Sequence, residues 1–342
     1  MPIGGMPRID ALPSGMRPTR HLLPRTEPTP ERHYLNRRQF LRQAGIGTIA
    51  LASGLPVAGC SAATSPSGRA RILRPGIERP EVLARFPAAR NRDFDLEQKL
   101  TDEVKAATHN NFYEFLPGRA SSIWHLTDRF VTDPWTIEVT GQCHKPGKFD
   151  IEDLFKFEQQ EERTYRFRCV EAWAMDVPWT GFELNKLLAR VEPHDDARFV
   201  KFLTVNRPDQ MPGQQRTRQQ YPWPYFEALT MAEAMNPLTL LATGIYGRPL
   251  PRQHGAPFRV IVPWKYGYKS PKSIVRIELV TRQPATFWQT LQPEEYPFLS
   301  NVNPKVPHPR WSQASEKMVG TRERRPTLLY NGYEEHVAGL YG

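Results

Sequence analysis

The chain of 342 residues carries a formal net charge of +10, and half of that excess lies in residues 1–60. Beyond residue 60 the basic residues are scattered among acidic ones, without a run rich in lysine or arginine. Such a mixed surface is not the footprint of a nucleic-acid-binding protein, and three cysteines are too few for a disulfide framework. The length allows one large domain, or two small ones, behind a leader.

The first segment has the composition of a leader. Residues 1–35 are rich in proline and arginine with little apolar periodicity, so we expect them to be disordered. Arg37 and Arg38 then precede a weakly apolar run over 43–59, a pattern typical of the twin-arginine signal peptides that export folded proteins. The run is too short and too rich in glycine to span a membrane permanently. We therefore predict export to the periplasm.

A second feature of the leader is the stretch Val57–Cys60, which resembles the box at which lipoproteins are cleaved and lipidated on cysteine. Short boxes of this kind arise by chance, so a lipid anchor at Cys60 is the less favoured alternative to ordinary cleavage. We expect a disordered extension and signal peptide over residues 1–65 and a single domain over residues 66–342.

The domain shows short segments of both strand and helix periodicity. Long stretches rich in proline separate them, and no internal repeat of twenty to fifty residues is present. The patterns predict strands at 135–140 and 197–205, a strand within 237–246, and strands ending at 169 and at 263. They predict helices within 93–105, from 151, over 182–191 and at 230–235. Loops are expected over 173–179 and 206–224, and an irregular segment over 296–315. Strands outweigh helices, which indicates a β-rich α+β domain.

Cys169 lies at the end of one of these strands. Tyr165, Phe167 and Cys169 alternate on one side of the strand, and Trp173 follows closely. A lone thiol walled by large rings suits a nucleophile or a ligand of a soft metal, because the thiolate is the reactive and ligating form. A buried structural cysteine explains the same pattern, since free cysteines are among the most buried residues.

The third cysteine, Cys143, lies in a stretch that reads as a strand end and a turn. His144 beside it resembles half of a zinc site, but the second ligand pair is missing. We therefore predict that Cys143 is a turn residue without a metal.

Two loops contain groups that suit a phosphate. In the run from His254 to Arg259, Gly255 lets the backbone approach a ligand closely, and Arg259 offers a forked cation. The following stretch, 260–273, ends in a loop whose lysines and glycine offer ammonium groups and backbone amides.

The run Arg-Cys-Val-Glu-Ala-Trp over 168–173 resembles the molybdenum-ligand segment of the sulfite oxidase family. Further motifs of that family match at Asn-Asn-Phe-Tyr-Glu-Phe over 110–115, at His-Gly-x-Pro-x-Arg over 254–259, and at 260–273. The likeness extends from about His109 to the C-terminus and is strongest to the periplasmic bacterial branch. It implies a sulfite-oxidase-like molybdopterin-binding oxidoreductase domain with mixed sheets, without haem or dimerisation domains, and a monomer.

The resemblance also implies roles for individual residues. Cys169 corresponds to the molybdenum ligand at the catalytic centre of the family. The residues that it implies for binding molybdopterin are Asn110, Tyr113, Glu114, Thr204, His254, Arg259, Ser270, Pro271 and Lys272.

Two of these positions depart from the family pattern or vary within it. Many relatives have Gly-Ile-Lys where this chain has Ser-Pro-Lys, so Pro271 lacks a backbone amide and contacts from Ser270 and Lys272 are favoured. Some members have asparagine in place of His254, which makes His254 a pterin contact rather than an obligatory acid or base.

Members of the branch that this chain resembles reduce methionine sulfoxide to methionine in the periplasm. The resemblance therefore implies molybdenum-dependent repair of oxidised periplasmic proteins. Because no haem or flavin motif is present, it also implies that electrons arrive from quinol through a membrane-embedded haem b subunit.

Two alternatives remain at this stage. Sulfite oxidation would use the same metal, but sulfite is a dianion and needs several cations around it. Ala174 stands where some relatives have arginine, which weakens a specific substrate assignment without favouring sulfite. A lipid-anchored binding protein, held at Cys60, would grip a ligand with the aromatic loops and contain no metal.

Overall fold

The computed structural model describes residues 65–342. The predicted twin-arginine motif, the cysteine at position 60 and most of the predicted signal peptide therefore lie outside the described residues. No helix within the described range has the length and apolar character needed to cross a membrane.

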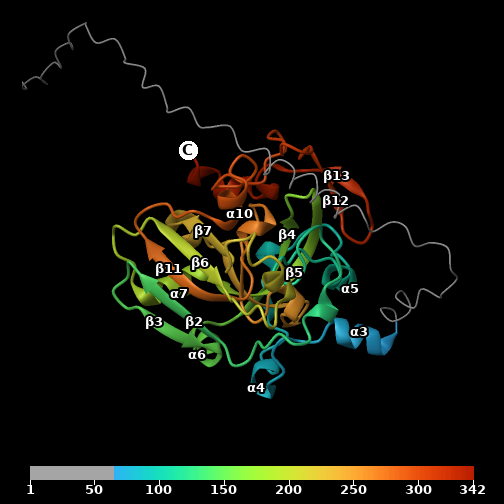
Figure 1. Ribbon diagram of the computed structural model, residues 1–342, viewed down its shortest axis with the longest axis horizontal. Coiled ribbons are helices and arrows are strands. Elements are labelled where there is room, and N and C mark those ends of the chain that lie inside the picture. Colours follow the sequence, from blue (N-terminus) through green and yellow to red (C-terminus); the bar gives the residue numbers. More distant parts are fainter. Residues whose placement is uncertain (1–64) are drawn as a thin grey trace, which may run out of the picture. The chain divides into compact units, whose positions relative to one another are not determined.

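One sheet has five strands and mixed pairing. Its order is β3 (Gly147–Asp150), β2 (Thr136–Gly141), β11 (Ile274–Val280), β6 (Phe199–Thr204) and β7 (Phe226–Thr230). β11 runs parallel to β2 and antiparallel to β6. Figure 1 shows this sheet on the left of the view.

The second sheet has eight strands and is branched. Its main path is β1 (Ala89–Arg90), β4 (Glu161–Arg168), β5 (Trp173–Glu183), β12 (Ser315–Met318) and β13 (Arg324–Pro326). β8 (Leu240–Ile245) pairs with β5, and β9 (Arg248–Pro249) and β10 (Arg259–Ile261) pair with β8. The parallel pairing of β12 with β5 attaches a strand from near the C-terminus beside the cysteine strand.

The helices are short. They are α3 (Pro66–Ile72), α4 (Pro80–Leu83), α5 (Glu103–Ala107), α6 (Ile151–Phe157), α7 (Leu184–Val191), α8 (Pro212–Arg216), α9 (Met231–Met235), α10 (Phe287–Leu291) and α11 (Glu334–Val337), with 3-10 turns that include η3 (Arg252–His254) and η4 (Gly267–Lys269). The predicted β-rich α+β class is confirmed.

Several elements form where the sequence pattern predicts them. α9 begins after Thr230, whose side chain forms a capping box with Glu233. α7 buries Leu184, Leu188 and Val191 on one face, as the helical spacing predicts. Apolar side chains of both sheets join one continuous core.

The loop predicted over 173–179 is wrong, because these residues belong to the long strand β5. All positions between its two end residues are buried, so the strand shows no alternation between apolar and polar residues. Pro178 is tolerated because the ladder with β8 begins at Trp179, so the missing N–H of the proline removes no hydrogen bond on that side.

The helix predicted within 93–105 is also wrong in its extent. The structure has a 3-10 turn at Arg92–Phe94 and the separate helix α5. Asp102 sets the start of α5, because its side chain accepts a hydrogen bond from the Lys105 N–H at 3.0 Å and caps the helix. The loop predicted over 206–224 contains one helical turn, α8.

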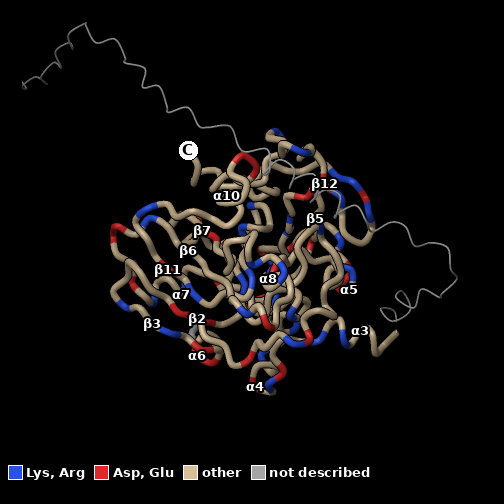
Figure 2. The backbone as a smooth tube through the Cα atoms, in the orientation of Figure 1, with Lys and Arg blue, Asp and Glu red and all other residues tan. Residues whose placement is uncertain are grey.

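Charged residues are interspersed over the described chain (Figure 2). Lysine and arginine alternate with aspartate and glutamate on strands and loops of both sheets.

Candidate active site

Cys169 follows directly after β4, where the chain reverses into β5. Its N–H donates to the Trp173 carbonyl at 2.9 Å, and its own carbonyl accepts from the Ala172 N–H at 3.1 Å. Ala172 adopts a left-handed conformation with a φ of 64°, which closes the turn. The side chain of Cys169 is buried, so this tight turn sets where its sulfur lies.

The sulfur of Cys169 is held as a thiol by its surroundings. The Glu171 N–H approaches Sγ at 3.5 Å. Burial raises the pKa of the Cys169 thiol to about 12, and the Glu171 carboxylate adds to the rise against the charges of Arg168 and Lys272. A bound cation would reverse this balance, since a metal favours the thiolate form of its ligand.

Arg168 stabilises the cysteine turn through hydrogen bonds. Its side chain is fully buried, and its guanidinium donates to the Cys169 carbonyl and, at 2.7 Å, to the side-chain oxygen of Gln313. Its Nε lies 2.9 Å from the Glu316 carboxylate, which is also fully buried. The backbone of the cysteine is therefore tied to a segment almost 150 residues further along the chain.

The C-terminal segment also holds the next carbonyl of the turn. Trp311 Nε1 and Gln313 Nε2 each donate to the Val170 carbonyl at 2.8 Å. Two donors on one carbonyl restrain the turn at the point where Cys169 leaves the strand.

A second group of predicted residues gathers around Lys272. Thr204 Oγ1 donates to Glu114 Oε1 at 3.4 Å, and both side chains are buried. The Lys272 ammonium lies 5.1 Å from the centroid of the Phe112 ring. Burial, together with the nearby Arg259 charge, lowers the pKa of Lys272 to about 8, although the Glu114 carboxylate acts in the opposite direction.

Arg259 is a buried cation without an acidic partner. Its guanidinium donates to the carbonyls of His254 at 2.9 Å and Ser270 at 3.2 Å, and it stacks 5.0 Å from the centroid of Trp179. It forms no ion pair with any carboxylate in residues 65–342, and its Nε has no hydrogen-bond partner. Burial lowers the pKa of Arg259 to about 9.

His254 lies on the same loop, in the turn η3. Its ring is buried and packs edge-on at 6.4 Å from the Trp179 ring. Burial lowers the pKa of His254 to about 3, and the charges of Arg259 and Lys272 act in the same direction. Gly255 follows with a φ of 93°, a conformation that favours glycine.

The polar groups of Ser270 and Pro271 are largely used within the protein. The Ser270 N–H donates to the Gly267 carbonyl at 3.1 Å, and its hydroxyl accepts from the Val262 N–H at 3.1 Å. The Pro271 carbonyl accepts from the Val260 N–H at 3.0 Å. Of the predicted stretch 270–272, the side chain of Lys272 is the group that remains available for a ligand.

Asn110 and Tyr113 lie in the segment between α5 and β2. Asn110 exchanges two backbone hydrogen bonds of 2.9 Å with Ser121, and its buried Oδ1 has no partner in the described structure. The Tyr113 ring packs edge-on against Trp288 at 4.8 Å. Burial raises the pKa of Tyr113, and the charges of Glu171 and Cys169 add to the rise.

The structure thus brings together Cys169, Lys272 and the buried groups around them. Sequence reasoning missed Glu171, Gln313, Trp311 and Tyr296 as neighbours of the thiol. Glu171 lies in the cysteine motif, so the sequence could have indicated it. No local sequence pattern indicates Gln313, Trp311 or Tyr296.

Cys143 lies outside this group. It is buried in the turn after β2, where its N–H donates to the Gly141 carbonyl at 2.8 Å. Within residues 65–342, no three histidine, cysteine or acidic side chains are grouped so as to hold a metal ion. A zinc site of the multi-ligand kind is therefore not formed there.

Comparison with known proteins identifies the family. Residues 125–288 match the family model described as an oxidoreductase molybdopterin binding domain. The chain is 45% identical over 326 residues, which is 93% of both chains, to the "Protein-methionine-sulfoxide reductase catalytic subunit MsrP" of Burkholderia mallei. This chain belongs to the MsrP family. The predicted family resemblance and the predicted molybdopterin-binding domain are confirmed.

A solved structure is also similar to this member of the MsrP family. It is the sulfane dehydrogenase SoxCD from Paracoccus pantotrophus, at 16% identity and a TM-score of 0.43. The match covers 70% of this chain and 58% of that chain.

The residues present fit the molybdenum cofactor of the MsrP family. The buried guanidinium of Arg259 lacks an anion, and the Lys272 ammonium lies close by, so a phosphate group would neutralise both. The unpartnered Oδ1 of Asn110 offers an acceptor to a heterocycle. The thiolate of Cys169 is a soft ligand that suits molybdenum.

Removing the guanidinium of Arg259 should weaken retention of the cofactor. We expect Arg259→Ala to lower the molybdenum content about tenfold or more, because a charge-assisted hydrogen bond contributes roughly 1.5–3 kcal/mol. The variant also leaves the buried carbonyls of His254 and Ser270 unpaired, so the free energy of unfolding falls as well. Elemental analysis of Arg259→Lys, which keeps the charge, should show an intermediate content, and equal contents in all three proteins would contradict the phosphate contact.

The buried ring of His254 makes stability depend on pH. Its folded-state pKa of about 3 lies below the ordinary value of about 6.5, so the unfolded chain binds the proton first. The free energy of unfolding should therefore fall as the pH drops below about 6.5, by about 2 kcal/mol between pH 7 and pH 5 from this group. Urea unfolding of apoprotein at both pH values measures the loss, and His254→Asn should lose correspondingly less. An identical loss in both proteins would show that the pKa of His254 is not lowered in the folded chain.

Proposed function

We propose that this chain reduces methionine sulfoxide, free and within proteins, to methionine. The reaction takes up two electrons and two protons and releases the oxygen as water. The observation that carries the proposal is the buried Cys169 thiol near the Lys272 ammonium, in a chain of the MsrP family. Tyr113, Trp288 and Tyr296 pack on one another and form the aromatic rim of the site.

The residues that hold the cofactor follow from their chemistry. Cys169 would bind the molybdenum, while Arg259 and Lys272 would hold the terminal phosphate of the molybdopterin. The bound metal supplies the oxygen-atom transfer and its redox chemistry. Asn110, with Tyr113 and the other predicted contacts, would line the heterocycle.

The protein itself restrains the cysteine turn and contributes uncharged aromatic side chains. Hydrogen bonds to the carbonyls of Cys169 and Val170 hold the turn in place. Tyr113 packs on Trp288 at 4.8 Å and Trp288 on Tyr296 at 5.2 Å, and Tyr296 reaches the cysteine turn through His308 and Trp311. The rings of Tyr113, Trp288 and Tyr296 carry no positive charge that would attract a sulfite dianion, so they suit a neutral sulfoxide better.

The decisive experiment compares the two oxygen-transfer reactions on purified protein from a molybdopterin-competent host. We expect one molybdenum per chain and rapid reduction of methionine sulfoxide by dithionite-reduced viologen. Stoichiometric zinc, or no metal, would refute the proposal. Sulfite oxidation with a soluble acceptor that exceeds sulfoxide reduction would move the function to sulfite.

We also propose the cellular setting that the sequence predicts. The chain would act in the periplasm as a monomeric catalytic subunit, receiving electrons from quinol through a membrane-embedded haem b subunit. The name of the Burkholderia mallei relative contains the words catalytic subunit, which supports a partner. We keep the predicted division into a leader over residues 1–65 and a domain over residues 66–342 as part of this proposal.

Export should depend on the paired arginines. Replacing Arg37 and Arg38 by lysine should leave a cofactor-loaded precursor in the cytoplasm, because the folded-protein route recognises the arginine pair. Immunoblots of periplasmic and cytoplasmic fractions measure the distribution. Undiminished periplasmic protein in the double variant would show that a different route is used, and the mass of the mature N-terminus would reveal any lipid on Cys60.

A further inference from the structure

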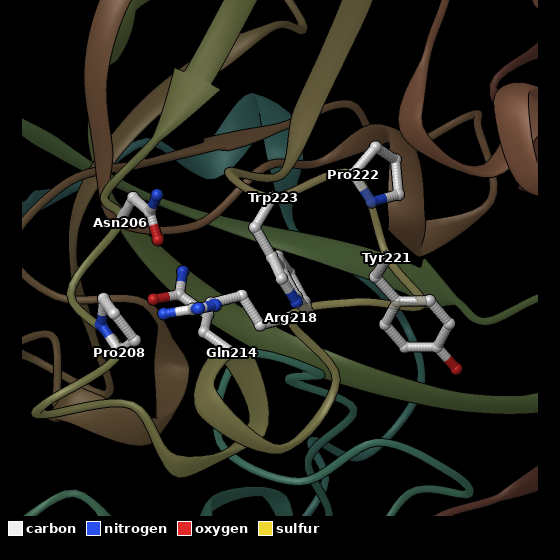
Figure 3. A pocket seen from close by; sticks show the side chains of 7 residues that line it. All are labelled: Asn206, Pro208, Gln214, Arg218, Tyr221, Pro222 and Trp223. Atoms are coloured by element: carbon white, nitrogen blue, oxygen red, sulfur yellow. The ribbon is translucent and has the colours of Figure 1, made fainter.

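A hollow of about 330 Å³ opens beside the aromatic rim of the site. It is formed by the stretch from residue 206 to residue 223, which includes α8. The hollow is lined by Asn206, Pro208, Gln214, Arg218, Tyr221, Pro222 and Trp223 (Figure 3).

The base of the hollow is held rigidly. Gln214 is buried, accepting from the Arg207 N–H at 2.8 Å and donating to the Val205 carbonyl at 2.9 Å. Trp223 is fixed by the hydrogen bond from its Nε1 to the Thr217 hydroxyl at 3.0 Å. Hydrogen bonds therefore fix the positions of two lining side chains, Gln214 and Trp223.

The exposed groups of the hollow are free to bind a ligand. Arg218 is exposed and forms no ion pair with any carboxylate of the described chain. Asn206 is exposed and presents an amide that can both donate and accept. In Figure 3 the Arg218 side chain extends between Gln214 and Trp223. An aromatic face, an amide and an unpaired cation together suit a polypeptide backbone with an acidic or apolar side chain.

The hollow is joined to the candidate active site through aromatic rings. The Tyr221 ring lies 6.1 Å from the Tyr113 ring and 6.4 Å from Trp288. Trp288 packs on Tyr296 at 5.2 Å, and Tyr296 contacts His308, which stacks on Trp311, the donor to the Val170 carbonyl of the cysteine turn. One lining residue of the hollow therefore packs on a residue of the rim above the thiol.

The backbone also connects the hollow to the site. The Gln214 N–H donates to the Glu114 carbonyl at 3.1 Å. A Cβ on Gly213 would lie 2.1 Å from the Tyr113 carbonyl oxygen, so α8 sits directly on the turn that contains Tyr113 and Glu114. The helix that helps to form the hollow therefore packs directly on the segment that carries the rim residue Tyr113.

We propose that this hollow binds the stretch of an oxidised polypeptide that flanks the methionine sulfoxide, while the sulfoxide side chain enters the rim above Cys169. The inference rests on the proposed function and adds the place on the surface where the polypeptide that flanks the sulfoxide binds. Arg218 favours an acidic residue close to the sulfoxide, and Asn206 bonds the peptide backbone.

The test compares peptide with small substrate on the loaded enzyme. The variant Asn206→Ala with Arg218→Ser removes only exposed groups, and Arg282→Ser, another exposed arginine, is the matched control. We expect the double variant to raise KM about tenfold for an unstructured peptide with one methionine sulfoxide, which corresponds to about 1.4 kcal/mol. Its kcat, and its kcat/KM for free methionine sulfoxide, should stay within about twofold of the parent values, because no group of the chemical site is changed.

Reversing the charge at position 218 tests whether Arg218 itself contacts the residue beside the sulfoxide. The parent should prefer a peptide with glutamate beside the sulfoxide over one with lysine, and Arg218→Glu should reverse that preference. Fluorescence anisotropy of labelled peptides, with methionine in place of the sulfoxide, measures binding without turnover and should follow the same order.

The outcomes separate the two proposals. If the parent reduces neither free nor peptide sulfoxide, the proposed function fails and the inference fails with it. If the parent reduces both and the double variant leaves the peptide KM unchanged, the hollow alone is refuted. Equal loss on both substrates would also refute it, because the residues would then serve the chemical site. Loss confined to electron delivery from the membrane would assign the hollow to the partner subunit.

Discussion

Replacing Cys169 by serine should remove nearly all sulfoxide reduction and abolish or shift the sulfur-to-metal absorption bands. In the proposed site the thiolate would be the soft ligand, and serine would replace it by a hard oxygen that donates charge differently. Groups that only orient a metal ligand already change activity by 10–100-fold, so the loss of the ligand itself should exceed about a hundredfold. The serine variant should still fold, because the backbone hydrogen bonds of the turn are kept.

The matched control is Cys143→Ser. That cysteine is also buried but lies in the turn after β2, away from the cluster around Lys272. Its activity with reduced viologen and its absorption spectrum should remain close to those of the parent. Sulfoxide reduction retained in Cys169→Ser, with unchanged bands, would refute the ligand assignment.

The second large effect should come from Glu316, which lies far from Cys169 in sequence. Its carboxylate is fully buried and contacts three guanidinium groups, at 3.2 Å from Arg166, 2.9 Å from Arg168 and 2.6 Å from Arg325. Glu316→Gln keeps the shape but removes the charge. Breaking a buried ion pair on one side typically costs 3–5 kcal/mol, because the remaining charges stay buried without compensation.

Denaturant unfolding of the apoprotein measures the loss, and Glu323→Gln provides the control because Glu323 is exposed on the same segment. Because Arg168 holds both Glu316 and the Cys169 carbonyl, a thiol reagent should also modify Cys169 faster in Glu316→Gln. A stability change below about 1 kcal/mol would show that the network contributes little.

The sequence by itself was enough for local features and for the chemistry of the motifs. Hydrophobic periodicity placed the strand that ends before Cys169, and cap chemistry placed the helix after Thr230, because both depend on neighbouring residues. The motifs that bring Arg259 and Lys272 to the site are also contiguous stretches. Family resemblance then identified the cofactor, which no periodicity could do.

Tertiary structure decided the elements and contacts that depend on distant residues. β5 was misread as a loop because both of its faces are covered, which removes the alternation that marks a half-buried strand. The contacts of Gln313 and Trp311 with the Val170 carbonyl join parts of the chain more than 140 residues apart. These long-range contacts leave no local pattern in the sequence. They form because the parallel pairing of β12 with β5 brings the C-terminal segment to the cysteine turn.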